Sequence, residues 1–482
     1  MKPFVVFTII VAYFCLLMVI SYLTSRKTDN ETYFTGDRKS PWFLVAFGMI
    51  GAGLSGVTFV SVPGMVANNN LYFFQFVLGN VLGYLFITFV LIPLYYKLRL
   101  VSIYGYLKNR FGTVSYKTGS LIFLISQSFG AALRLLLAAK ILQFVFFDSI
   151  GVPFILTVVV ILILVWLYTN KSGIKTIVWT DTIQTAFLIM GAVFTIVAIM
   201  QSFNFTVGGA IHAVKEHEYF KIFEWNGNSP NNFFKQFISG FFIAIAMMGL
   251  DQNMMQKTLT CKNRWDAQKN TLTYSLILAG TQFLFLGLGI LLYLYAENNG
   301  VYLPQDKNGT FLDTDMLFPN LTMNYLGTLA GVSFLLGIIA ASFSSVDSAL
   351  TALTTSFTYD FLEIDKKIGT NVRSVKNKVL IAFSTILFLI IMVFSGSKGD
   401  VISLVFTMAG YTYGPLLGLF MFGMFTKIQL KDKWVPIICV LAPISTYFIG
   451  IFLKESYGFD MGFFTIAVIG ALTLIGLILI RK

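Results

Sequence analysis

The sequence predicts an all-α polytopic membrane protein with about 13 transmembrane helices. Of its 482 residues, 56% are apolar and only 12% are charged. Apolar stretches of about 20 residues, the length at which a helix spans a bilayer, recur from one end of the chain to the other. We therefore expect residues 1–482 to form a single transmembrane domain, without an attached soluble domain.

The first apolar stretch could be mistaken for a secretory signal. It lacks a basic start beyond Lys2, and no small-residue cleavage site follows it, so it is interpreted as a retained helix. The other spans follow it, separated by polar segments. In order, the predicted spans are 4–24, 41–67, 72–96, 119–147, 151–170, 175–201, 235–256, 270–296, 326–359, 379–396, 400–426, 434–453 and 460–480.

The basic residues predict the orientation. With the N-terminus outside, alternate loops face the cytoplasm and carry most of the 34 Lys and Arg residues, among them Lys257 and Lys262. We therefore expect a multi-pass protein of the cell inner (plasma) membrane, with its N-terminus outside and its C-terminus cytoplasmic. The same bias accounts for the net charge of +12, so this charge indicates no nucleic-acid partner, and no obligate protein partner is evident.

Residues 340–362 carry many hydroxyl side chains for a membrane span. On a helix, small or hydroxylated residues would follow one face at i, i+3, i+4 and i+7. These residues are Ala341, Ser344, Ser345, Ser348, Thr351, Thr355 and Thr358. Oxygen ligands suit a hard cation such as Na⁺. The alternative is a small-residue face through which two membrane helices pack closely.

The span 41–67 is unusual for its glycines. Gly48, Gly51, Gly53 and Gly56 fall within nine residues and weaken a continuous helix. Unwound backbone at membrane depth is tolerated only beside protein or a polar cavity, and its freed carbonyls can bind Na⁺. Close packing is again the alternative. Together, a broken helix and a hydroxyl-bearing helix would supply oxygen atoms for one site.

Ionisable residues within the spans mark either a functional site or an ion pair, since a charge in lipid costs about 3 kcal/mol or more. Arg134 is either a fixed cation for an anionic substrate or half of a structural pair with a buried Asp. Asp181 and Asp347 either help to neutralise a bound cation or pair with Arg134 or Lys140. Asp251 lies near the cytoplasmic end of its predicted span, so we expect it to be structural.

The chain is not predicted to be an enzyme. Its two histidines, His212 and His217, lie in a polar loop, and its three cysteines are far apart. The spans therefore lack the clustered nucleophile, base or metal ligands that a membrane-embedded enzyme needs.

The sequence resembles the sodium:solute symporter family along nearly its whole length. The similar segments are the hydroxyl-rich stretch, Tyr33-Phe34-x-Gly36, the broken helix Gly51–Phe59, Trp179-Thr180-Asp181, Asp251-Gln252 with Gln256-Lys257, and Gly414-Pro415. The resemblance implies a LeuT-like fold with two inverted five-helix repeats. These would be residues 41–201 and 235–426, with an extra N-terminal helix and loop at 1–40 and C-terminal helices at 427–482.

The resemblance also implies the ion sites. The principal Na⁺ site would use the backbone carbonyls of Gly51, Leu54 and Ala341 and the hydroxyls of Ser344 and Ser345. A second Na⁺ site, known in the sialic acid branch of the family, would use Asp181, Asp347 and Ser348, together with Ser344. That branch has Ser where this chain has Asp347, whose carboxylate would either strengthen the cation site or take a different partner such as a basic residue.

The cargo is inferred from the same resemblance. Arg134 is similar to the arginine that holds the carboxylate in sialic acid symporters, and Ser55, Thr58 and Phe73 are similar to residues of that substrate pocket. We therefore expect Na⁺-coupled symport, by alternating access, of a small carboxylate-bearing solute such as sialic acid. The alternatives are a Na⁺-coupled sugar or amino-acid symporter and a proton-coupled carrier that uses Asp181 or Asp347.

Overall fold

The computed structural model describes residues 3–25, 40–98, 100, 102–169, 174–307, 309–364, 372–396 and 400–482. Within these ranges the chain is helical, and extended pairing is limited to isolated bridges such as Ser40 with Cys261. The predicted motif Tyr33-Phe34-x-Gly36 lies outside the described residues, as do several basic loop residues, Arg26 and Lys171 among them.

The helices of the first half of the chain coincide with the six predicted spans, and two short helices, Gly105–Arg110 and Val207–Glu216, lie outside them. The helices of this half are α1 (Pro3–Ser25), α3 (Trp42–Gly53), α4 (Gly56–Gly64), α5 (Val66–Asn69), α6 (Phe73–Phe86), η2 (Ile87–Leu91), α7 (Ile92–Leu98), α8 (Gly105–Arg110), α9 (Thr113–Leu142), η3 (Gln143–Phe147), η4 (Asp148–Ile150), α10 (Phe154–Thr169), α11 (Ile174–Ser202) and α12 (Val207–Glu216).

The second half continues in the same way. Its helices are α13 (Phe233–Ala244), η5 (Ile245–Gly249), α14 (Gln252–Thr258), α15 (Arg264–Asn298), η6 (Thr314–Met316), α16 (Leu317–Asn324), α17 (Gly327–Ser356), η7 (Phe357–Phe361), α18 (Val372–Phe394), α19 (Val401–Phe425), η9 (Asp432–Trp434), α20 (Val435–Tyr457), η10 (Gly462–Phe464) and α21 (Thr465–Leu479).

Each predicted span coincides with an apolar helix or a bent helix pair. Among the described residues, nine helices are long and apolar enough to cross a membrane, and two bent pairs would raise that number to 11. The two remaining predicted spans fall on shorter apolar helices, Val6–Val19 and Phe154–Leu167. The polytopic all-α prediction is confirmed, while the count of thirteen stays a prediction.

The predicted break in the first bent pair lies between α3 and α4, whose axes differ by 55°. Leu54 leaves the helical region, with φ −87° and ψ 74°, and Ser55 caps α4. The glycines also permit close packing, because a Cβ on Gly53 would lie 2.0 Å from the Tyr274 hydroxyl oxygen and one on Gly56 would lie 2.5 Å from Ser342 Oγ. This glycine-rich span is therefore both broken and closely packed, while Na⁺ binding by its carbonyls stays a prediction.

A second break, which the sequence analysis missed, divides the predicted span 235–256. The segment Phe233–Gly249 meets α14 at 68°. Asp251 lies at this break and caps α14, since its carboxylate accepts a hydrogen bond from the Met254 amide at 3.1 Å. Each predicted repeat thus begins with a bent pair, but the bounds 41–201 and 235–426 stay predictions.

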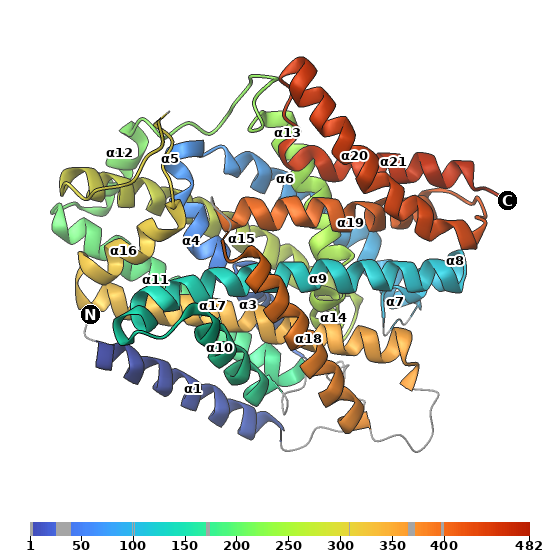
Figure 1. Ribbon diagram of the computed structural model, residues 1–482, viewed down its shortest axis with the longest axis horizontal. Coiled ribbons are helices and arrows are strands. Elements are labelled where there is room, and N and C mark those ends of the chain that lie inside the picture. Colours follow the sequence, from blue (N-terminus) through green and yellow to red (C-terminus); the bar gives the residue numbers. More distant parts are fainter. Residues whose placement is uncertain are drawn as a thin grey trace.

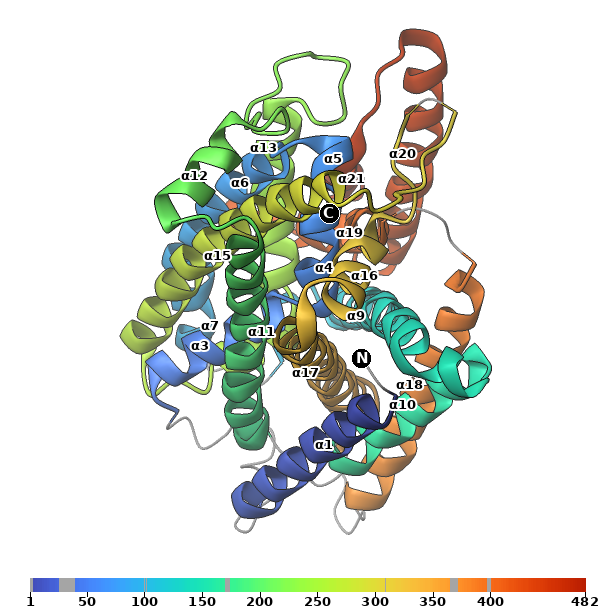
Figure 2. The same cartoon turned by 90° about the vertical axis from the view of Figure 1, so that its left-hand side faces the viewer.

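The long helices α9, α17 and α19 run along the longest axis of the molecule (Figure 1), and α15 crosses them (Figure 2). α1 begins at the end of the bundle that carries α12 and α16, whereas the chain ends on the opposite side, with α8. Seen along that axis, α17 lies among α11, α1 and α9 (Figure 2). Its apolar window is 83% buried, against 22% for the helix that includes α20. The hydroxyl-rich face of α17 therefore lies inside the protein and not against lipid.

A close backbone contact between α6 and α13 gives a stability prediction. A Cβ on Gly240 would lie 2.0 Å from the Phe76 carbonyl oxygen. We expect Gly240→Ala to lower the free energy of unfolding by about 2 kcal/mol, because the two backbones would have to separate. Gly280→Ala, on the open side of α15 with no atom within 4 Å, is the control and should unfold at or slightly above the wild-type temperature, because Ala favours a helix. Equal melting temperatures for the two variants would refute this packing.

Asp315, in the short helix η6 at the α12 and α16 end, gives a pH prediction. Burial raises its pKa to about 6, although its Oδ2 accepts a hydrogen bond from the Val401 amide at 2.9 Å. A raised pKa stabilises the fold while the carboxyl is protonated, and this stabilisation is lost as pH rises through about 6. Asp315→Asn should therefore melt above the wild type at pH 7.5 and at the wild-type temperature near pH 4. A difference independent of pH would contradict this assignment.

Candidate ion and substrate site

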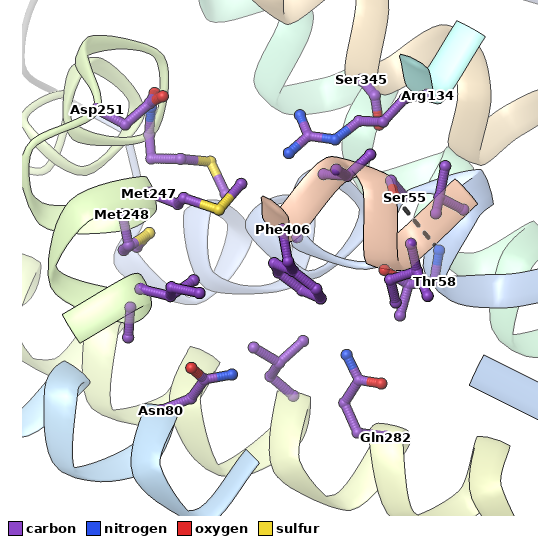
Figure 3. A pocket seen from close by; sticks show the side chains of 18 of the residues that line it. Ser55, Thr58, Asn80, Arg134, Met247, Met248, Asp251, Gln282, Ser345 and Phe406 are labelled. Carbon is purple, nitrogen blue, oxygen red and sulfur yellow. Dashed lines mark hydrogen bonds between the residues drawn. The ribbon is translucent and has the colours of Figure 1, made fainter. Parts of the chain in front are cut away.

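A cavity lies between the two helix breaks and contains all four predicted substrate residues. Ser55 and Thr58 reach it from the first break, Phe73 from α6, and Arg134 from α9. The second break contributes Met247, Met248, Asp251, Asn253 and Met254, and α15, α17 and α19 add Gln282, Ser345 and Phe406. Figure 3 shows Arg134 and Ser345 across the cavity from Met247, Met248 and Asp251.

Arg134 is the cation of this cavity. Its guanidinium points into the open space (Figure 3). Within the described part of the chain, it forms no hydrogen bond or salt bridge to another residue. Asp251 lines the same cavity but is held by the Tyr413 hydroxyl, which donates to its Oδ2 at 2.5 Å, and by the Met254 amide. Among the described residues no Asp forms a salt bridge with Arg134, and Asp251 interacts with it only electrostatically, across the cavity.

Three amide side chains in the cavity wall were not identified from the sequence. They are Asn80, Gln127 and Gln282, from α6, α9 and α15. In the described part of the chain, Asn80 Oδ1, Gln127 Nε2 and Gln282 Oε1 are buried without a hydrogen-bond partner. Because a buried polar atom costs free energy when it is unpaired, these atoms would accept or donate hydrogen bonds to water or to a polar ligand in the cavity. An isolated amide inside an apolar span is the signal that could have identified them.

Phenylalanine rings separate this cavity from an outer hollow. Phe73 lines both the cavity and the hollow, and the hollow also includes Asn69, Asn231 and Phe463. The ring centroid of Phe406 lies 4.9 Å from that of Phe76 and 5.3 Å from that of Phe463. Phe73 is thus a wall of the cavity, as predicted, and also part of its aromatic cover.

The predicted principal Na⁺ ligands lie around the first break. α17 packs against both α3 and α4. Leu54, Ala341, Ser344 and Ser345 are buried, with 2% exposure or less. Ser345 Oγ donates to the Ala341 carbonyl at 2.9 Å, and Ser345 also lines the substrate cavity. Carbonyl and hydroxyl oxygens of the kind that Na⁺ needs therefore adjoin the cavity directly.

Gly51, the remaining predicted ligand, faces α11. A Cβ on Gly51 would lie 2.4 Å from Thr185 Oγ1 and 3.2 Å from the Asp181 carbonyl oxygen. α3 therefore approaches the helix that carries Asp181, so the two predicted ion sites are neighbours.

The residues of the predicted second Na⁺ site do come together, but around a lysine. Lys257 Nζ donates to Asp181 Oδ2 at 2.7 Å and to Ser348 Oγ at 2.9 Å. Ser344 Oγ donates to Asp181 Oδ1 at 2.5 Å, and Asp347 Oδ1 accepts from the Ser348 amide at 2.5 Å.

The sequence analysis assigned Lys257 to a cytoplasmic loop, and this was wrong. Its side chain is only 1% exposed, and it is the ion-pair partner of Asp181 in place of Arg134 or Lys140. The break before α14, which the sequence analysis missed, turns this short helix and its lysine into the protein.

Comparison with known proteins agrees with this architecture. A model of the sodium:solute symporter family matches residues 33–430. The sodium/sialic acid symporter NanT of Aliivibrio fischeri is 24% identical over 96% of this chain and 90% of its own length. SiaT of Proteus mirabilis, also a sodium/sialic acid symporter, is 23% identical over 98% of this chain and 93% of its own.

Solved structures give the fold. A Na⁺-coupled sialic acid symporter in a substrate-bound outward-open state is similar with a TM-score of 0.81, at 21% identity, over 99% of this chain and 98% of that one. MHP1, a nucleobase-cation-symport-1 family transporter, gives a TM-score of 0.52 at 13% identity, over 92% of this chain and 93% of its own. The LeuT-like fold is confirmed.

Family membership distinguishes between the activities that the sequence left open. The match covers most of the chain, and the family consists of transporters, not enzymes. Sodium is the coupling ion. The chain thus belongs to the sodium:solute symporter family, as a Na⁺-coupled secondary active transporter of the plasma membrane.

Proposed function

We propose that this protein takes up a sialic acid, or a closely similar carboxylate-bearing sugar acid, together with Na⁺. The observation that carries the proposal is the Arg134 guanidinium, which faces the cavity and forms no hydrogen bond or salt bridge with any described residue. Guanidinium binds carboxylate through two parallel charge-assisted hydrogen bonds, so the cargo carboxylate would bind here. The two sodium/sialic acid symporters, each similar over nearly its whole length, support this choice of cargo.

The rest of the cavity suits a hydroxylated and amidated ring. Ser55 and Thr58 offer hydroxyls, and the unpaired amides of Asn80, Gln127 and Gln282 offer further donors and acceptors. A buried polar group that is satisfied only by cargo discriminates strongly against solutes that lack the matching group. The phenyl ring of Phe73 would cover the apolar side of the cargo.

We assign the principal Na⁺ ion to Gly51, Leu54, Ala341, Ser344 and Ser345. Ser345 lines the cargo cavity, so the ion and the cargo would stabilise the same arrangement of α17 and the first break. Linkage then requires that Na⁺ raise cargo affinity by the factor by which cargo raises Na⁺ affinity. Asp181, Asp347 and Ser348 remain the proposed second cation site. The N-terminus is proposed to lie outside, because the long polar segments would then face outward and the basic loops inward.

Uptake by the purified protein in proteoliposomes tests this function. Radiolabelled sialic acid should accumulate when Na⁺ is imposed outside, and should not do so when K⁺ replaces Na⁺. Glucose, galactose and proline, offered under the same gradient, distinguish the sugar and amino-acid alternatives. Accumulation of one of these instead of sialic acid would contradict the proposed cargo, and accumulation driven only by a proton gradient would contradict sodium coupling.

A further inference from the structure

Lys257 occupies an unusual position for a lysine. It comes from the last turn of α14, yet its ammonium is buried between α11 and α17. It donates to a carboxylate oxygen of Asp181 at 2.7 Å and to the Ser348 hydroxyl at 2.9 Å. Three separate helices, α11, α14 and α17, thus place one positive charge among hard oxygen atoms.

Those oxygen atoms are the ones that a second Na⁺ ion would need. Asp181 Oδ2 and Ser348 Oγ already accept from Lys257, and Asp181 Oδ1 accepts from Ser344. An ammonium carries the same unit charge as Na⁺ and uses the same oxygen lone pairs. A Na⁺ ion placed beside it would have to share these oxygen atoms with the ammonium, and would be repelled by its like charge in a water-poor interior.

We propose that the Lys257 ammonium is the resident cation of the second site, so that this chain couples one Na⁺ ion to each cargo molecule. The inference rests on the proposed principal Na⁺ site, which would hold that one ion. Lys257 is part of α14, the helix that follows the second break. The second cation therefore belongs to the protein, and it neither enters with cargo nor leaves with it.

The alternative within the structure is a salt bridge that only joins α14 to α11. The two interpretations differ in what happens when the ammonium is removed. A purely structural pair would leave the buried Asp181 carboxylate without a counter-ion in any salt. Removal of a resident cation would leave a site of carboxylate and hydroxyl oxygens that Na⁺ can enter. Na⁺, and not another salt cation, would then restore the lost stability.

Counting bound Na⁺ on the purified protein tests the proposal without reference to cargo. At saturating ²²Na⁺, the wild type should bind one ion per chain and Lys257→Met should bind two. Lys257→Arg keeps the charge and should bind one. Lys235→Met is the matched control, since it also removes a buried lysine, 6% exposed, which is held elsewhere by the Ser229 and Asp460 carbonyls. This control should bind one ion.

Melting temperatures in two salts test the proposal even if Lys257→Met is too unstable for a count of bound ions. In choline chloride, Lys257→Met should melt well below the wild type, and NaCl at equal ionic strength should raise its melting temperature more than that of the wild type. Two bound Na⁺ ions in the wild type would overturn the inference while leaving the proposed function intact. A Lys257→Met deficit that is equal in both salts would also overturn it. No bound Na⁺ in the wild type would refute the principal site as well.

Discussion

Arg134→Met is expected to reduce Na⁺-driven sialic acid uptake, measured as kcat/KM, by at least about 100-fold, because the cargo carboxylate would enter a buried site without its counter-charge. Stability should not fall. The guanidinium makes no hydrogen bond or salt bridge within the described part of the chain, so its removal breaks none. The melting temperature with Na⁺ alone should therefore stay at or above the wild-type value.

Two further variants separate charge from geometry. Arg134→Lys keeps the positive charge but loses the planar fork, and should lose about tenfold in uptake. Lys140→Met removes the same charge from the same helix outside the cavity, and should leave uptake near wild type. If Arg134→Met transported normally, or lost activity only because it unfolded, the assignment of Arg134 to the carboxylate would be wrong.

Ser345→Ala is expected to raise the Na⁺ concentration for half-maximal uptake by about 10- to 100-fold. Mutation of residues that only support the ligands of a metal ion commonly lowers metal affinity by this factor, and a direct ligand should cost at least as much. Folding should survive, because Ser345 Oγ donates only to the Ala341 carbonyl within its own helix. Half-maximal activation, measured over a NaCl series at constant ionic strength, reports the change. At saturating Na⁺, uptake should approach the wild-type rate.

Ser333→Ala is the matched control for this prediction. It makes the same change on α17, three turns toward the end of the bundle that carries α16, and Ser333 does not line the cavity. Its Na⁺ requirement should equal that of the wild type. A Ser345→Ala protein with unchanged Na⁺ activation would remove Ser345 from the ion site.

The fold was largely predictable because hydrophobic length and the bias of basic residues are local properties of a membrane sequence. The first break was predictable because four glycines within nine residues weaken a continuous helix. The second was not, because only Gly249 lies near it and the capping carboxylate of Asp251 is also an ordinary interfacial residue in a linear sequence. The number of membrane spans and the bounds of the two repeats depend on where the bilayer lies along each helix. Composition alone does not define that position.

The candidate site was predictable in part. The hydroxyl face of α17 and Arg134 stand out because polar atoms are expensive in lipid. Lys257 does not stand out, because a lysine near the end of a span is also what the positive-inside rule predicts for a cytoplasmic loop. Its burial follows from the bend before α14, which brings it to Asp181, 76 residues earlier in the chain. The cavity amides were missed for a similar reason, because which face of a helix meets the cavity is decided by tertiary packing.

The most direct test of the account compares sialic acid with its methyl ester, which has nearly the same shape but no carboxylate charge. Binding of each to the purified protein is measured by calorimetry, in NaCl and in choline chloride. The account predicts that the acid binds only in NaCl, that the ester binds at least about 100-fold more weakly, and that Arg134→Met removes this difference. Equal affinity for acid and ester in the wild type would contradict it.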